Sequence, residues 1–289
     1  MKKLFLLFSI HLLWVTPAAA QNKTDLENGR VFGKVKTVRV ERAKLNNDGE
    51  RLIEKPRILL AFHAFDNSGY AIEQRTYNPD GSPVSKTRWA MTYDTEDREV
   101  ERYFYNERDV AAARSVSVYN EKGQKAEVTT YCPLHLINHI QTFAYDEKGN
   151  KILEVIHSGD GSLRSKISYA YDNHNNLIEV VYMRPDETVR QRDLYSYDDQ
   201  SNRLGMIIFD YKNTPVINRR YKPDGKGNRI ENAYYDGGET LKVKETLSSY
   251  EFDDRGNWVK VKIAREIYKG DKTITEADMM YRSFAYFGK

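Results

Sequence analysis

Apolar and polar residues alternate along most of the chain, which predicts strands with two different faces. In residues 163–171 the odd positions Leu163, Ile167, Tyr169 and Tyr171 are apolar or aromatic, and the even positions are charged or small. A period of two residues places these sets on opposite sides of a β-strand. No stretch shows a sustained helical period. The sequence therefore predicts an all-β chain whose sheet has an aromatic face and a charged face.

A turn motif recurs between the strands. An Asp or Asn is followed three residues later by a residue that in most copies tolerates a positive φ angle, and from Asp94 to Asp224 the first positions are 26 residues apart. A fixed period of this size indicates a repeat architecture. An Asp at the first position of a type I turn bonds the backbone ahead of it. The predicted structural turn residues are Asp94, Asn120, Asp146, Asp172, Asp198, Asp224, Asp253, Gly149, Gly227 and Gly256.

A second turn lies between consecutive copies, at residues 78–82, 158–162, 184–188 and 211–215. Each repeat is thus two strands and two tight turns, and such short connections suit antiparallel neighbours. The sequence predicts a repetitive antiparallel β-meander of 26-residue, two-strand repeats with about sixteen to eighteen strands. Because open sheets of more than about ten strands rarely stay flat, we expect a twisted or coiled extended sheet.

The amino terminus has the three regions of a secretory signal peptide. Lys2 and Lys3 precede an apolar run over residues 4–15, and Ala18 and Ala20 occupy the small-residue positions before Gln21. The apolar run is too short to span a membrane. We expect residues 1–20 to be removed on export, leaving a periplasmic or extracellular protein with no transmembrane segment. The remaining expected units are an N-terminal strand and cap region (21–61), the repeat array (62–256) and a C-terminal capping hairpin (257–289).

Composition narrows the classes of function. The formal net charge is +3, and removal of Lys2 and Lys3 leaves +1, so nothing indicates a nucleic-acid partner. Charged residues make up 30% of the chain, which is too polar for one thick core, and Tyr is used 21 times. A single cysteine excludes an intramolecular disulfide. Stability must then come from strand pairing and side-chain ladders.

The motif Tyr-Asp-x-x-Gly-Asn, complete at residues 145–150, resembles the tyrosine-aspartate (YD) repeats of the Rhs family. The resemblance covers roughly residues 62–260. The chain departs from the pattern at Asn175 and Ser201, which replace Gly, and at Pro223, which replaces the Tyr before Asp224. The resemblance implies an extracytoplasmic all-β repeat scaffold. In large Rhs and teneurin-like proteins such repeats build a spiral shell around a toxin or form surface structures, and carbohydrate binding is associated with them. This chain resembles a short, stand-alone, secreted version.

One short segment could carry metal or nucleophile chemistry. Cys132, His135 and His139 lie where a second turn of the repeat should fall. On one strand His135 and His139 would be about 13 Å apart, too far to share a zinc ion without a bend. Cys132 and His135 lack a third residue to orient a nucleophile pair. We therefore predict a turn here, with no metal site and no cofactor.

The repeated Asp residues also invite an interpretation as calcium ligands. Calcium needs six to eight converging oxygen atoms, which one Asp per turn does not supply. Glu154 and Glu179 have no evident carboxylate partner for glycoside hydrolysis. The sequence therefore nominates no catalytic residue.

The aromatic rows are a candidate ligand platform. Cross-strand packing is the simpler explanation for such rows, but exposed rings could also stack on sugars. The candidate platform residues are Tyr145, Tyr171, Tyr197, Trp89 and Trp258.

These observations favour a secreted, non-catalytic scaffold with a binding or structural role at the cell envelope or outside the cell, and a glycan or another envelope component as its partner. One alternative is an outer-membrane β-barrel, which requires a continuous lipid-facing apolar band. Residues 189–195 show no apolar side, which disfavours it. Another alternative is an exported hydrolase whose site is not recognised.

Overall fold

The structure, a computed structural model, describes residues 31–48, 51–226 and 228–288. The predicted signal peptide and Gly227 lie outside these ranges. The described residues form antiparallel strands and contain no α-helix, as the sequence predicts. A membrane-spanning helix is accordingly absent from this part of the chain. The strands are β1 (Val35–Asn47), β2 (Leu52–Glu54), β3 (Ile58–Phe65), β4 (Ala71–Tyr77), β5 (Pro83–Tyr93), β6 (Glu99–Tyr105), β7 (Ala111–Tyr119), β8 (Lys125–Tyr131), β9 (Ile137–Tyr145), β10 (Lys151–Ser158), β11 (Leu163–Tyr171), β12 (Leu177–Met183), β13 (Val189–Tyr197), β14 (Arg203–Asp210), β15 (Pro215–Pro223), β16 (Arg229–Tyr235), β17 (Leu241–Phe252), β18 (Trp258–Lys269) and β19 (Lys272–Tyr286).

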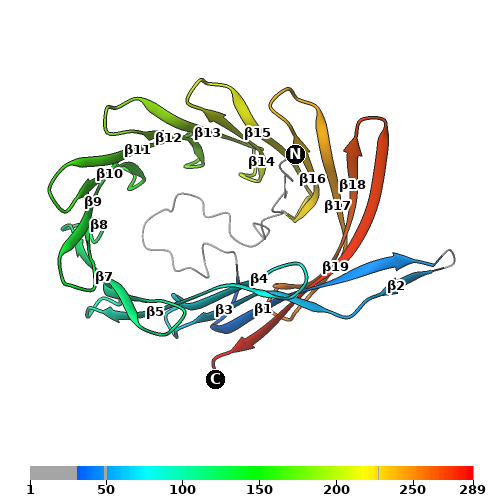
Figure 1. The fold of residues 1–289 in the computed structure, drawn as a ribbon, viewed down its shortest axis with the longest axis horizontal. Helices are drawn as coiled ribbons and strands as arrows, with labels where there is room; N and C mark the ends of the chain where they lie inside the picture. Colours follow the sequence, from blue (N-terminus) through cyan, green and yellow to red (C-terminus); the bar gives the residue numbers. More distant parts are fainter. Residues whose placement is uncertain (1–30, 49–50, 227, 289) are drawn as a thin grey trace.

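The sheet closes on itself. From β3 to β19 each strand pairs with the next along the chain, and β1 pairs with both β3 and β19. Eighteen strands thus form a ring, while β2 pairs only with β1 and projects from the wall (Figure 1). The expected twisted or coiled extended sheet is wrong in this respect, because the sheet closes into a ring. Closure gives both terminal strands a partner, and it removes the exposed edges of an open sheet.

The terminal segments take part in this closure. Residues 21–61 and 257–289 were expected to cover the two ends of an array. In the structure β1 runs against β19 from Val38, opposite Phe284, to Leu45, opposite Ala277. The two segments pair with each other as members of the ring, because a closed sheet leaves no end to cover.

Both sets of turns share one geometry. In each, the first residue's carbonyl accepts a hydrogen bond from the amide three residues on, and that third residue has a positive φ angle. Asn175 and Ser201, which replace Gly, adopt φ angles of 61° and 62°. The second turn predicted at residues 211–215 begins at Asp210, one residue earlier than the sequence suggested. A one-residue register shift follows each turn, as at Ala170/Tyr171, so the hairpins close with a bulge.

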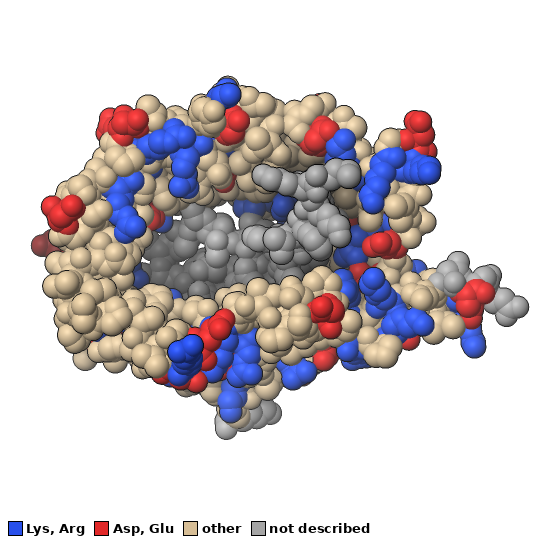
Figure 2. All heavy atoms as spheres, viewed as in Figure 1, with Lys and Arg blue, Asp and Glu red and all other residues tan. Residues whose placement is uncertain are grey.

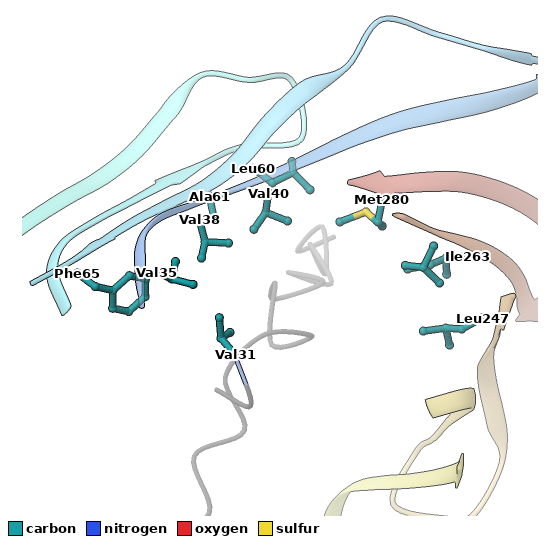
Figure 3. Close-up of a cluster of buried hydrophobic side chains, with 11 residues drawn as sticks. Val31, Val35, Val38, Val40, Leu60, Ala61, Phe65, Leu247, Ile263 and Met280 are labelled. Carbon is teal, nitrogen blue, oxygen red and sulfur yellow. The ribbon is translucent and has the colours of Figure 1, made fainter. Parts of the chain in front are cut away.

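The register defines an inner and an outer face, because directly paired residues share a face. Val38 and Val40 on β1 point to the concave side of the ring, toward Ile263 and Leu247 (Figure 3). Following the pairs around the ring places Tyr169, Val180, Asp193 and Ile208 on this inner face. These four residues lie side by side on β11, β12, β13 and β14.

The hydrophobic core lies at the seam where the ring closes. It joins β1 and β3 to β17, β18 and β19, and Val35, Val40, Val261 and Ile263 are at most 1% exposed. Burial of each such side chain contributes about 1.5–3 kcal/mol. Away from the seam the wall is a single layer, as the polar composition suggested. The strand that closes the ring thus also contributes Val35, Val38 and Val40 to this core.

Two glycines mark where neighbouring second turns touch. Gly159 donates a backbone hydrogen bond to Asn138 O at 3.0 Å, and a Cβ atom on Gly159 would lie 1.9 Å from Ile137 O. A Cβ atom on Gly237 would lie 1.9 Å from Pro215 O. Only glycine allows these close approaches, which hold the hairpins together along this rim.

We expect Gly159→Ala to lower the free energy of unfolding by about 2 kcal/mol or more, because the methyl group must displace backbone. Thermal and urea unfolding followed by circular dichroism measure this. Gly225→Ala is the matched control, since its Cβ meets no atom within 4 Å. Equal stability of the two variants would contradict the contact between turns.

Candidate functional site on the inner wall

The repeated Asp residues hold the first set of turns. Asp172 Oδ1 accepts the backbone N–H groups of His174 at 2.9 Å and Asn176 at 2.8 Å, and Oδ2 accepts Asn176 Nδ2 at 2.9 Å. The same arrangement recurs at Asp146, Asp198 and Asp224. The Asn228 side chain, which donates to Asp224, lowers the pKa of that carboxyl. The carboxylate oxygens of these Asp residues thus accept hydrogen bonds from N–H groups of their own turns. Within the described ranges no group of His, Cys, Asp and Glu could hold a metal ion.

The asparagine that ends each motif has a role that the sequence analysis missed. It reaches back to the second carboxylate oxygen and closes a ring of hydrogen bonds over the turn. The fixed four-residue separation of Asp and Asn in the motif was the available signal. At the seam Asn257 does more, because its Oδ1 accepts the Phe32 N–H at 2.8 Å and its Nδ2 donates to Phe32 O at 2.9 Å.

The three platform tyrosines lie on alternate strands β9, β11 and β13, near the first set of turns. Each hydroxyl donates to a backbone carbonyl at the start of the strand immediately before its own, next to the preceding first turn. Tyr145 reaches Lys125 O at 2.7 Å, Tyr171 reaches Lys151 O at 3.0 Å and Tyr197 reaches Leu177 O at 2.9 Å. Burial raises the pKa of Tyr145 to about 12. The motif tyrosines therefore tie each repeat to the preceding one.

The structure does not bring the two platform tryptophans together. Trp89 lies on β5, on the inner face, opposite Phe104. Trp258 begins β18 near the seam, where the Arg282 guanidinium lies 3.9 Å from its ring centroid. Trp89 is thus separate from Trp258 and from the tyrosine row.

Cys132 and His135 form a turn, as the sequence predicts. Cys132 N donates to Leu136 O, and His135 has a φ angle of 61° at the third position after Cys132. His139 lies on β9 opposite Thr130, and burial lowers the pKa of its imidazole. The three side chains come from one turn and the strand after it, and the structure gathers no further ligand around them.

Buried carboxylate groups lie next to aromatic rings on the inner wall. Glu154 accepts hydrogen bonds from Gln141 Nε2 at 3.1 Å, Lys151 Nζ at 2.9 Å and Tyr169 Oη at 3.1 Å. Sequence reasoning treated Glu154 as an isolated charge. The alternation of residues within a strand does not reveal which partners adjacent strands supply, so only the register identifies this network.

Asp193 and Glu245 make similar contacts farther along the wall. Asp193 accepts from Gln191 Nε2 at 2.8 Å, and burial raises the pKa of its carboxyl. Glu245 is 2% exposed and accepts from Asn232 Nδ2 at 3.0 Å and Arg265 Nε at 2.7 Å. Glu154 and Asp193 share no hydrogen-bonding partner, whereas Glu245 and the buried Asp278 on β19 both accept from the Arg265 guanidinium.

The outer face carries ion pairs between neighbouring strands. Arg114 Nη1 lies 2.8 Å from Glu101 Oε1, and Lys244 Nζ lies 3.0 Å from Glu231 Oε2. In Figure 2, Lys and Arg lie beside Asp and Glu around the outside of the ring. Exposed pairs of this kind contribute at most about 1 kcal/mol each. Their main effect is to keep the outer surface hydrated.

No protein-family model and no curated protein matches the chain. Among solved structures, the chain is similar to a porin-like protein from Bacteroides uniformis, with a TM-score of 0.43 and 9% identity over 88% of this chain and 99% of that chain. It is also similar to part of the Photorhabdus luminescens Tc holotoxin pore, with a TM-score of 0.37 and 12% identity over 80% of this chain and 13% of that chain. A porin-like protein from Bacteroides vulgatus gives a TM-score of 0.30 and 13% identity over 73% of this chain and 94% of that chain. These scores are too low to carry an argument about function.

We expect Tyr171→Phe to lower the free energy of unfolding by about 1 kcal/mol, because Lys151 O loses its hydroxyl donor. Urea unfolding of the purified mature protein measures the change. Tyr105→Phe is the control, because the described residues provide no hydrogen bond to its hydroxyl. If both variants unfold at the same urea concentration, the tie between repeats contributes nothing to stability.

Proposed function

We propose that the chain is a secreted, non-catalytic binding scaffold of the YD-repeat type that takes its ligand inside the ring. The difference between its two faces carries this proposal. The outer face is occupied by ion pairs between strands, whereas the inner face gathers aromatic rings and partly buried charged groups. Concave surfaces with aromatic walls and a few placed polar groups are the usual ligand sites of proteins. A glycan is the candidate ligand, as the resemblance to YD repeats implies.

The hydrogen bonding of the inner carboxylates favours binding over catalysis, because even Glu245 and Asp278, which lie close together, are both bonded to Arg265. The inner carboxylates Glu154, Asp193 and Glu245 each have their own hydrogen-bond donors, and these donors belong to the wall. Such networks hold side chains in place. The proposal therefore assigns no catalytic residue and treats the wall as a preorganised surface.

A membrane-embedded barrel is the second candidate function. Closure of eighteen strands favours it, since a β-sheet can span a bilayer only when it has no free edge. The outward side chains oppose it. Arg192 on β13 pairs with Glu179 on β12, and Arg114 on β7 pairs with Glu101 on β6, near the middle of their strands. A cation on the lipid face costs about 2–4 kcal/mol at the bilayer midplane. We therefore rank this function second.

A glycan array probed with the mature protein tests the first proposal, and a hydrolysis assay on every bound glycan tests its non-catalytic part. We expect binding without hydrolysis. Trp89→Ala should weaken binding by up to about tenfold if sugars contact the inner wall, because a stacked ring contributes about 0.5–1.5 kcal/mol. Tyr131→Ala on the outer face is the control and should bind normally. Turnover of a bound glycan, or equal weakening by both variants, would refute the proposal.

Fractionation of cells separates the two candidate functions. We expect the mature protein in the soluble periplasmic or extracellular fraction, and no flotation with phosphatidylethanolamine–phosphatidylglycerol vesicles, because ion pairs line its outer face. An authentic outer-membrane porin in the same cells serves as the control. Recovery of the protein only after detergent extraction would favour the membrane barrel instead.

A further inference from the structure

We propose that three arginines on the inner wall, Arg203, Arg219 and Arg229, form a site for an oxyanion, a phosphate or carboxylate group carried by the ligand. We call these residues the arginine patch. They belong to three adjacent strands, β14, β15 and β16. This inference rests on the proposed function, because it places the ligand inside the ring and specifies its chemistry.

Each arginine of the patch lies against an inner-face tyrosine. The guanidinium carbon of Arg203 is 4.6 Å from the Tyr195 ring centroid, that of Arg219 is 5.3 Å from Tyr234, and that of Arg229 is 3.9 Å from Tyr221. In such cation–π contacts the negative face of the ring attracts the guanidinium group. The rings hold the guanidinium groups on the wall. Arg203 Nη2 donates to Tyr197 Oη at 3.5 Å, and the other N–H groups of the three arginines have no acceptor among the described residues.

The repeat places two of these arginines at equivalent positions. Arg203 follows Asp198 by five residues, and Arg229 follows Asp224 by five. The two backbones are two strands apart, about 10 Å. Arg219 lies on the strand between them, farther from the first set of turns. The three groups therefore surround one region of the wall.

The patch has no carboxylate to neutralise it. None of its three arginines forms an ion pair with a described acidic residue, whereas arginines on the outer face of the same strands do. Arg220, the next residue after Arg219, pairs with Glu239 at 3.0 Å, and Arg192 on β13 pairs with Glu179. Asp193 and Glu245 accept the hydroxyl groups of Tyr195 and Tyr234, the rings that Arg203 and Arg219 lie against, at 3.4 and 3.0 Å. Their other donors are Gln191 for Asp193 and Asn232 and Arg265 for Glu245, so neither carboxylate pairs with an arginine of the patch. The inner wall thus carries local positive charge.

Burial makes this arrangement costly without an anion. Desolvation lowers the pKa of Arg229, and the charge of Arg203 lowers it further. Arg203 and Arg229 repel each other in a partly buried place. An anion that accepts hydrogen bonds from both would stabilise their charged forms. Guanidinium groups donate pairs of N–H bonds to phosphate and carboxylate oxygens, a geometry that Lys cannot reproduce.

The same geometry argues against a stacked neutral sugar at this point of the wall. The faces of Tyr195 and Tyr221 that a sugar ring would cover lie under Arg203 and Arg229. An acidic group on the ligand therefore fits the patch, while neutral parts of the ligand fit uncovered rings such as Trp89.

Isothermal titration calorimetry of the mature protein with inorganic phosphate, tripolyphosphate and citrate tests the site. We expect saturable binding of at least one probe, weakened by added salt. Arg203→Gln/Arg219→Gln should weaken it about tenfold or more, because each lost charge-assisted hydrogen bond costs about 1.5–3 kcal/mol. Arg192→Gln/Arg220→Gln, which removes the same charge from the outer face, should bind within about twofold of wild type. Preference for tripolyphosphate identifies a phosphate ligand, and preference for citrate a carboxylate ligand.

A charge-conserving variant distinguishes loss of the binding site from loss of the folded structure. Arg203→Lys/Arg219→Lys keeps both cations and should bind with intermediate affinity, and thermal unfolding shows whether each variant is folded. Equal weakening by the inner and outer variants, or no binding below about 1 mM for any probe, would overturn the site. Binding of neutral glycans that depends on Trp89 would then leave the proposed function standing. Absence of any binding on the inner wall, of anions and of neutral glycans alike, would refute both the arginine patch as a site and the proposed function.

Discussion

The pairing of β1 with β19 is the interaction on which the rest of the molecule depends. It joins residues more than two hundred positions apart, buries Val40 and Ile263 at the seam and satisfies the edges of both strands. Without it the meander would be an open sheet with two solvated faces and two exposed edges. With it, one face becomes concave and the other convex. The distinction between inner and outer residues, and hence every functional argument about this chain, follows from that closure.

The repeats outside the seam hold together by a different means. Each Asp, its Asn partner and the residue with positive φ fix a hairpin locally, and each motif Tyr joins a hairpin to the preceding one through a carbonyl. These contacts are short in sequence and recur every 26 residues. The wall therefore resembles other repeat proteins, in which neighbouring units provide most of the stability. The seam is the exception, because it needs the whole chain.

Local chemistry could be predicted from the sequence and closure could not. The boundaries of β11 at Leu163 and Tyr171 follow from alternation and turn residues. The type of every first turn follows from its Asp and the residue three positions on. Whether β1 meets β19 depends instead on the twist summed over all strands, and no single residue encodes that sum. The inner networks were hidden for the same reason. Glu154 looks isolated in the sequence because Gln141 and Tyr169 become its neighbours only through the register of β9, β10 and β11.

The shared geometry of the two turn sets bears on how such a molecule can change size. Since every repeat enters and leaves the ring through the same bulged hairpin, duplication of one 26-residue unit would add two strands without altering any turn. The circumference would grow by about 10 Å and the diameter by about 3 Å. The number of repeats therefore sets the bore of the ring, while the residues inside each repeat set what lines it. The inner diameter of the ring and the residues on its inner face can therefore change independently in evolution.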